Sequence, residues 1–354
     1  MIIFLSEGLC RLLWSAPDWS DGLDVGTQLL PHPTRIWALE PGAKRQFGVD
    51  IQIDAAGLRA SAHDEVSPSW LVLGDSSFFG HGLADTDTLH WQLSRELANM
   101  GQARGVRCGG VPGYSILQSQ ILMDEVGWSL EPELLVIGNL WSDNNIDYFV
   151  DKAWLDALHR PSARLIGVLR HSKLFLWAWT RLRPPQKKTG QGDPQAKISW
   201  LRDPYAKGQR RVAIDDYASA LDAVVAEAGR RNIGVVLIQP ANVYRVDQSV
   251  GEATWDPYFR AMREIATYRE VPMLDVAAYF RAFGLSSQKG FIDELHPSGV
   301  GNQYIAQGIV LQLQAAGWPS KQPIPNSKPP IEANWTDKWA DGVEFEANTG
   351  GGGP

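Results

Sequence analysis

The chain is poor in cysteine and lacks long apolar runs, and each shortage excludes a class of protein. Its two cysteines, Cys10 and Cys108, are too few for a disulfide framework, and we interpret both as small buried residues. No apolar run reaches the ~18 residues that a membrane-spanning helix needs. The histidines show no metal-ligand spacing, and no glycine-rich phosphate loop is present. The sequence therefore predicts neither a metal site nor a cofactor.

An excess of positive charge is also missing. The 33 Lys and Arg residues against 40 Asp and Glu residues give a net charge of −7, so no overall basic field would attract nucleic acid. The apolar start, Met1–Leu5, is short and has neither a basic segment nor a small-residue cleavage site, so it makes a poor signal peptide. As written, the sequence predicts a soluble, cytoplasmic protein. A start further upstream would change that expectation.

What is present from residue 69 onward is an alternation of short apolar runs with helical patterns. Buried strands are predicted at 70–74, 106–108, 134–138, 234–239 and 272–276. Helices are predicted at 88–100, 116–126, 213–230, 254–268 and 299–316. This alternation is typical of an α/β fold in which helices cover both faces of a parallel sheet. Such sheets carry their chemistry in loops at the carboxyl ends of the strands.

The chain divides into three predicted parts. Residues 1–67, with dense Pro and Gly, indicate an N-terminal segment with a small β-rich unit and a short helix at 6–20. Residues 68–316 form the α/β domain, and residues 317–354 an irregular tail. Residues 151–211 interrupt the α/β pattern with fourteen Lys and Arg residues against four Asp residues. We interpret them as a helical insertion, either with a solvated basic rim or as a cap that attracts an anionic substrate or a membrane surface.

A serine follows the first buried strand, in the run Gly74–Gly80 (Gly-Asp-Ser-Ser-Phe-Phe-Gly). At a turn from strand to helix, the backbone N–H of Ser76 can face a developing oxyanion. The alternative is that Asp75 or Ser76 only caps a helix. Gly-Asp-Ser by itself is a weak signal.

A second motif, Asp293-Glu-Leu-His296, precedes the last predicted helix. A nucleophilic serine needs a base for its proton and a carboxylate that orients the base, and Asp and His three residues apart can supply both. The alternative is an exposed loop in which Pro297 and Ser298 begin the helix.

Together the two motifs resemble those of the SGNH (GDSL) hydrolase superfamily, in particular a bacterial esterase or O-acyl esterase branch. The resemblance implies a flavodoxin-like three-layer α/β/α fold, with Ser76 as nucleophile and Asp293 and His296 completing a catalytic triad. The segment 6–13 also looks like the juxtamembrane end of an N-terminal anchor in relatives. This implies a periplasmic or membrane-anchored alternative to the cytoplasm.

The resemblance also implies an oxyanion hole. The run Gly110–Ser115 is similar to the family's second block, in which Gly113 takes the place of an N–H donor beside that of Ser76. A plain Pro-Gly turn is the alternative. The third block departs from the family's Gly-x-Asn-Asp, because Ser142 stands where the donor asparagine is expected. Asn139, Asn144 or Asn145 could substitute for it.

The function expected from these residues is a serine esterase acting on small acyl esters, with O-acetyl groups on a glycan or a metabolite as candidates. One alternative is an acyltransferase that uses the same triad on a sugar or lipid hydroxyl, with the Trp-rich insertion excluding water. Another is a non-catalytic glycan-binding or scaffold relative. His81, five residues after Ser76, is interpreted either as lining the pocket or as a structural residue.

Overall fold

Five parallel strands form the central sheet of the computed structural model, which describes residues 29–60, 66–146, 150–158 and 208–331 and the single residues 172, 174 and 205. The strands are β5 (Ser69–Leu73), β6 (Gly105–Cys108), β7 (Leu134–Ile137), β8 (Gly234–Gln239) and β9 (Met273–Asp275). Their spatial order is β6-β5-β7-β8-β9. Numbered along the chain this order is 2-1-3-4-5, which is the flavodoxin-like arrangement. The predicted α/β/α fold class is confirmed.

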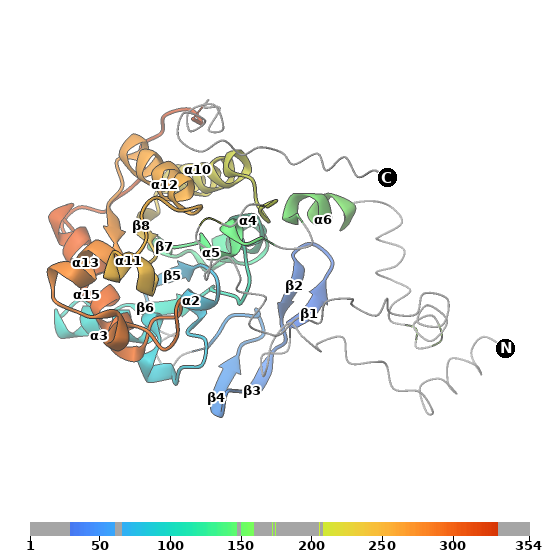
Figure 1. Cartoon of the computed structure of the whole chain (residues 1–354), viewed down its shortest axis with the longest axis horizontal. Coiled ribbons are helices and arrows are strands. Elements are labelled where there is room, and N and C mark those ends of the chain that lie inside the picture. The colour runs from blue at the N-terminus through green and yellow to red at the C-terminus, as the bar shows by residue number, and fades with distance from the viewer. Residues whose placement is uncertain are drawn as a thin grey trace.

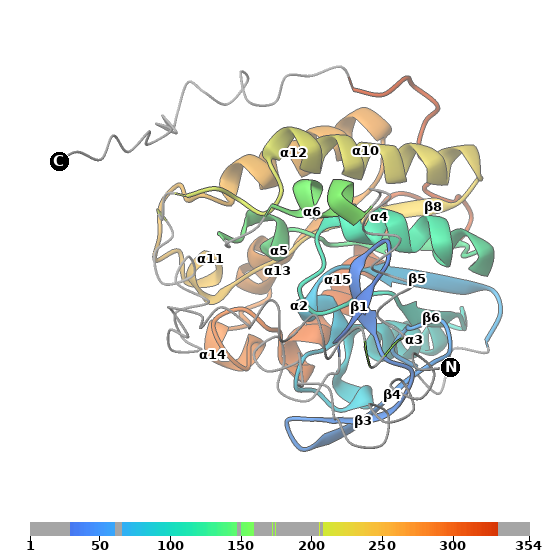
Figure 2. The same cartoon turned by 90° about the vertical axis from the view of Figure 1, so that its right-hand side faces the viewer.

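Helices cover both faces of the sheet (Figures 1 and 2). One layer holds α4 (Ile116–Glu125), α10 (Ile214–Arg230) and α12 (Asp256–Arg269), and the other holds α3 (Leu89–Asn99), α13 (Val276–Ala282) and α15 (Gly299–Ala315). The shorter helices are α2 (Ser76–Phe79), α5 (Trp141–Asn144), α6 (Asp151–Leu158), α11 (Val243–Asp247) and α14 (Ser287–Gly290), with 3-10 turns η1 (Asp85–Asp87) and η2 (Gly127–Leu130). None of the helices in the described part of the chain is long and apolar enough to cross a membrane.

The buried positions of the strands are almost all apolar, because each strand packs against helices on both sides; Gln239 of β8 is buried but donates to the Phe259 carbonyl. In β5, Leu71 and Leu73 face the α4–α10–α12 layer, whereas Trp70 and Val72 face the α3–α15 layer. The same alternation recurs in β7 and β8. Two hydrophobic cores thus hold the sheet, and the strand ends carrying polar loops meet at one edge.

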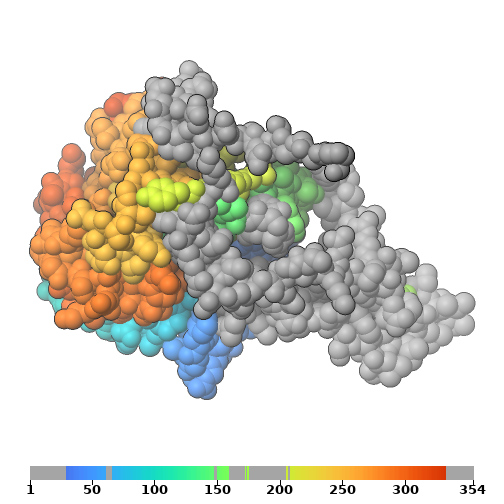
Figure 3. Space-filling model, in the orientation of Figure 1, coloured from blue at the N-terminus to red at the C-terminus, as the bar shows by residue number. Residues whose placement is uncertain are grey.

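The predicted N-terminal β unit consists of two antiparallel hairpins. Strand β1 (Leu29–His32) pairs with β2 (Ile36–Leu39), and β3 (Gly42–Gln46) pairs with β4 (Val49–Ile53). The β3–β4 hairpin projects from the body of the molecule (Figure 3). Arg59 joins this unit to the main sheet through bridges to Ile53 and Cys108. The predicted helix at 6–20 and Cys10 lie outside the described residues.

The described parts of the predicted insertion are its two ends. Helix α6 opens it, and Arg211 at its far end forms a buried ion pair with Asp151. Most of the residues between them lie outside the described ranges. After α15 the described chain up to residue 331 contains no helix or strand, and Trp318 is buried against Trp70. The domain boundaries stay a prediction.

Candidate active site

Ser76 lies after the carboxyl end of strand β5, as the first residue of the short helix α2. Asp75 caps this helix, because its Oδ1 accepts the Ser77 N–H at 2.9 Å. Of the two residues that the sequence offered as caps, Asp75 is the one that caps the helix. The left-handed Gly80 (φ +81°) ends the helix after one turn. This tight strand–turn–helix leaves the Ser76 side chain half-buried at the edge of the sheet.

The loop that precedes α15 brings His296 to Ser76 across 220 residues of sequence. His296 Nε2 lies 2.8 Å from Ser76 Oγ, and His296 Nδ1 lies 2.7 Å from Asp293 Oδ2. Both distances are those of hydrogen bonds. The hydroxyl, the imidazole and the carboxylate are thus linked by two consecutive hydrogen bonds. In this arrangement a serine can lose its proton to an imidazole that a carboxylate orients.

The electrostatics of Asp293 suit an orienting carboxylate. Burial alone would raise its pKa, but hydrogen bonds from the His296 ring and from the N–H groups of His296 and Leu295 outweigh burial and lower the pKa to about 2. Asp293 Oδ1 accepts these two N–H groups at 2.7 and 2.8 Å. One oxygen therefore shapes the loop while the other holds the ring, and the carboxylate stays ionised at neutral pH.

The Asp293–His296 loop is itself anchored. The Ile292 N–H donates to the His296 carbonyl at 2.9 Å, which closes the turn. The Val243 N–H of α11 donates to the Glu294 carbonyl at 3.1 Å. Ser298 then caps α15 by accepting the Gly301 N–H. Because the loop is bound on both sides, the imidazole is placed before any substrate arrives.

Gly113 lies in the loop after β6, which packs directly on the loop of Ser76. The Val111 N–H donates to the Gly74 carbonyl at 3.1 Å, and a Cβ on Gly110 would come within 2.8 Å of the Phe79 nitrogen. Gly113 itself has a left-handed φ of +77°, which glycine adopts at no steric cost. Among the described residues, no acceptor is recorded for its N–H. Gly113 therefore lies in the loop adjoining that of Ser76, and its role as an oxyanion donor stays a prediction.

Ser142 lies at the start of α5, after strand β7, and is tied to the nucleophile loop. Its backbone N–H donates to Asp75 Oδ2 at 3.3 Å, so the buried Asp75 joins the loops after β5 and β7. Burial raises the pKa of Asp75, although the N–H bonds from Ser77 and Ser142 act against this. The half-buried Ser142 is thus tied by its backbone to the residue that precedes Ser76, and its role as a donor stays a prediction.

The alternative donors differ. The Asn139 amide is fully buried and donates to Ser119 Oγ of α4 at 2.9 Å, so at least one of its donors is used in packing; its role in the oxyanion hole stays a prediction. Asn144 is also fully buried, and neither its amide nitrogen nor its amide oxygen has a partner among the described residues. Asp143 holds the start of α4 by accepting the Ile116 N–H at 2.8 Å.

His81 lies directly against His296, with ring centroids 4.8 Å apart. Gln46 from the β3–β4 hairpin holds His81 Nδ1 at 3.0 Å, and the exposed Phe47 ring meets it edge-on. Burial, followed by the charge of His296, lowers the pKa of His81 to about 4. The buried Arg59 fixes this loop by donating to the Gly80 and Leu83 carbonyls, among other partners. The sequence did not predict that the β3–β4 hairpin contacts His81. Its only signal there was the alternation of apolar and polar residues that is typical of a strand.

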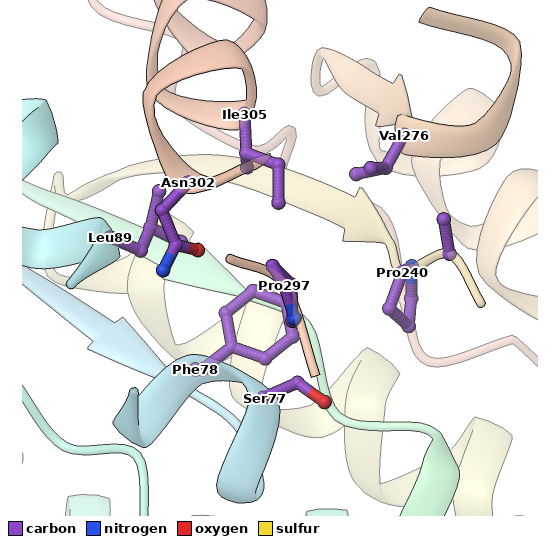
Figure 4. A pocket seen from close by; sticks show the side chains of 9 residues that line it. Ser77, Phe78, Leu89, Pro240, Val276, Pro297, Asn302 and Ile305 are labelled. Atoms are coloured by element: carbon purple, nitrogen blue, oxygen red, sulfur yellow. The ribbon is translucent and has the colours of Figure 1, made fainter. Parts of the chain in front are cut away.

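A small, mostly apolar pocket lies behind the two loops (Figure 4). Ser77 and Pro297, the neighbours of Ser76 and His296, line it together with the Phe78 ring. Asn302 and Ile305 of α15 close one side. The two loops are therefore seated on hydrophobic core. Among the described residues, no group of three or more His, Cys, Asp or Glu side chains is arranged to hold a metal ion.

Comparison with known proteins gives matches in structure alone. No family model and no curated protein matches the sequence. The chain is similar to a lipase/acylhydrolase from Enterococcus faecalis (15% identity, 74% of this chain and 99% of that one, TM-score 0.45). It is also similar to Axe2, an acetylxylan esterase from Geobacillus stearothermophilus (17% identity, 72% and 97%, TM-score 0.45). At these low values the likenesses carry no argument about the chemistry of this chain.

Proposed function

We propose that this chain is a serine ester hydrolase of the SGNH type, with Ser76 as nucleophile, His296 as general base and acid, and Asp293 as the orienting carboxylate. The continuous hydrogen-bonded chain from Ser76 Oγ through His296 to Asp293, at 2.8 and 2.7 Å, carries this proposal. A satisfied structural cluster would not need an imidazole bonded on both nitrogens at the carboxyl edge of the sheet. Nucleophilic catalysis needs that arrangement.

In the first half of the reaction, Ser76 Oγ attacks the ester carbonyl carbon while its proton passes to His296 Nε2. The negative charge of Asp293 stabilises the imidazolium that forms. The N–H groups of Ser76 and Gly113, with the Ser142 hydroxyl, donate hydrogen bonds to the carbonyl oxygen as it becomes an oxyanion. When the intermediate collapses, the bond to the alcohol breaks, and His296 returns the proton to the leaving alkoxide. The acyl group stays on Ser76.

In the second half, water replaces the alcohol. His296 takes a proton from the water as its oxygen attacks the acyl carbonyl, and the same donors hold the second oxyanion. Collapse expels Ser76, which recovers its proton from His296, and the acid leaves. The enzyme returns to its starting state without any group beyond its own side chains and water.

The substrate class we propose is a small acyl ester, with an O-acetyl group on a glycan or metabolite as the leading case. The side chains of His296 and Asp293 are 13% and 42% exposed, so the triad lies near the surface. An open site suits a bulky alcohol, because the alcohol can remain in solvent while only the acyl group meets Ser76. This exposure favours an acetyl ester of a bulky alcohol over an ester of a long acyl chain, because a long chain would need a deep apolar tunnel.

The experiment is labelling with a fluorophosphonate probe, followed by mass spectrometry to locate the modified residue. We expect the label on Ser76, and loss of both labelling and p-nitrophenyl acetate hydrolysis in Ser76→Ala. Ser129→Ala, which removes a hydroxyl from the remote η2 turn, should leave both unchanged. Labelling elsewhere, or unchanged turnover in Ser76→Ala, would overturn the proposal.

Product analysis with an added sugar or lipid alcohol separates hydrolysis from acyl transfer. An esterase releases the free acid whether or not the alcohol is present. Accumulation of the acylated acceptor in place of the acid would identify an acyltransferase that uses the same triad. Glycan binding without labelling of Ser76 would identify a non-catalytic relative.

A further inference from the structure

Strand β2, the second strand of the first hairpin, is joined by side-chain hydrogen bonds to the loop that carries Gly113. Trp37 Nε1 donates to the Pro112 carbonyl at 3.2 Å, and Tyr114 Oη donates to the Trp37 carbonyl at 2.7 Å. Gln118 Nε2 adds a bond of 2.8 Å to the Arg35 carbonyl. All these atoms are buried. The hairpin is therefore a fixed wall of the loop, rather than a separate appendage.

Arg211 binds the same loop from the far end of the predicted insertion. Its Nη1 donates to the Gly113 carbonyl at 2.7 Å. Its Nε and Nη2 form a two-pronged pair with Asp151 at 2.9 and 2.7 Å, and Nη2 also reaches Gln118 Oε1. The guanidinium lies over the Trp37 ring, 5.3 Å from its centroid. Since Arg211 and Asp151 are both almost fully buried, this arrangement is rigid.

The two residues hold the two peptide planes on either side of Gly113. Trp37 holds the Pro112–Gly113 plane through its carbonyl, and in a trans peptide the N–H points the opposite way. That N–H is the proposed oxyanion donor. Arg211 holds the following plane through the Gly113 carbonyl. A Cβ on Gly113 would lie 3.2 Å from Trp37 Cζ2, so the indole also packs against the Cα.

Resting on the proposed function, we propose that Trp37 and Arg211 are positioning residues that preorganise the Gly113 N–H for the oxyanion. Donors stabilise a transition state only to the extent that they are aimed before the charge develops. A four-residue turn with a left-handed glycine has several conformations available, and the clamp from two sides selects one. The N-terminal hairpin and the base of the insertion thereby act on the reaction through a single glycine.

The first test is Trp37→Phe, which keeps the ring and removes the N–H donor. We expect kcat for p-nitrophenyl acetate to fall about tenfold with KM within about twofold, because the donor acts on the transition state. The matched control is Trp70→Phe, which removes an indole bond to Glu133 at the opposite end of β5. It should keep kcat within about twofold. A kcat in Trp37→Phe no lower than in Trp70→Phe would overturn the positioning role.

The second test is Arg211→Lys, compared with Arg269→Lys. Both arginines form buried two-pronged pairs with an aspartate and also bind backbone carbonyls, but Arg269 binds Asp222 and the tail, away from the site. Both variants should lose similar thermal stability. Only Arg211→Lys should lower kcat, again by about tenfold, and equal kcat values in the two variants would overturn the proposal.

A readout independent of turnover separates this inference from the esterase itself. In hydrogen–deuterium exchange, peptides covering residues 109–116 should exchange about tenfold faster in Trp37→Phe than in the wild-type chain or in Trp70→Phe. Unchanged exchange there overturns the clamp. Absence of Ser76-dependent turnover in the wild-type chain would instead overturn the esterase, and the exchange measurement would still decide whether Trp37 holds the loop.

Discussion

His81 stacks on His296, with the two imidazole planes inclined by 30° and their centroids 4.8 Å apart. His81 is uncharged near neutral pH, because burial and the neighbouring His296 lower the pKa of His81 to about 4. His81 therefore presents an uncharged ring to His296 throughout the working range. When His296 takes the proton of Ser76, the face of a neutral aromatic ring lies next to the new positive charge, instead of a second cation.

This lowered pKa predicts how stability depends on pH. A folded His81 takes up its proton only below about pH 4, whereas the unfolded residue does so below its ordinary value of 6.5. The folded state therefore loses stability as the pH falls from 6.5 to 4, by about 3 kcal/mol in total at about 1.4 kcal/mol per pKa unit. In His81→Phe this part of the loss should vanish. Denaturant unfolding at pH 7, 5.5 and 4.5 measures it, and parallel curves for the two proteins would contradict it.

Asp293→Asn should leave the fold intact and slow the reaction. The amide oxygen can still accept the N–H groups of Leu295 and His296, but the negative charge that supports the imidazolium is gone. We expect kcat to fall by roughly 10²- to 10⁴-fold. Steady-state kinetics with a thermal melt measures both effects. The control, Glu294→Gln, removes a neighbouring exposed charge, and a comparable loss there would mean that net charge alone is responsible.

Because the pKa of Asp293 is already lowered to about 2, its titration lies far below the working range. Its ionisation stabilises the folded state above its ordinary pKa of 3.8, and this contribution is lost as the pH falls toward 2. We therefore expect the free energy of unfolding of the wild-type chain to fall more steeply than that of Asp293→Asn between pH 4 and pH 2. Parallel pH dependences of the two proteins in denaturant unfolding would contradict this.

Ser142→Ala tests the third oxyanion donor. If the hydroxyl donates to the oxyanion, kcat should fall by about 10²- to 10³-fold with little change in KM, since that is the usual contribution of one oxyanion donor to the rate. The backbone N–H bond from residue 142 to Asp75 stays in place, so the loop should keep its position. An unchanged kcat would assign the third donor to another residue, and Asn144 would be examined next.

Gly138→Ala should destabilise the folded protein next to the site. A Cβ at Gly138 would lie 1.8 Å from the Phe78 ring, which sits on the carboxyl ends of β5 and β7. Overpacking of this kind typically costs about 1–3 kcal/mol. We expect at least that loss in denaturant unfolding. Gly251→Ala, where the nearest atom is 3.9 Å away, is the control and should change the unfolding free energy by less than about 0.5 kcal/mol.

The positions of the main strands and helices could be predicted from local patterns of apolar and polar residues. The apolar runs at 70–74 and 134–138 and the helical periods around them correspond to the observed elements within a residue or two, because burial on both faces and a 3.6-residue repeat are properties of short segments. The motifs around Ser76 and Asp293 could be recognised in the sequence for the same reason, since helix capping and turn formation depend on three or four neighbouring residues.

Only the tertiary structure decided which distant groups meet. The approach of His296 to Ser76 depends on the strand order of the sheet, and no local preference specifies that order. Packing also decided that the Asn139 amide binds Ser119 of α4, which its sequence position gave no reason to expect. Trp37 and Arg211 carried no motif at all. Their positions against Gly113 follow from a hairpin and an ion pair that exist only once the chain is folded, because a hydrogen bond between distant residues is set by their placement in space and leaves no periodic trace in the sequence.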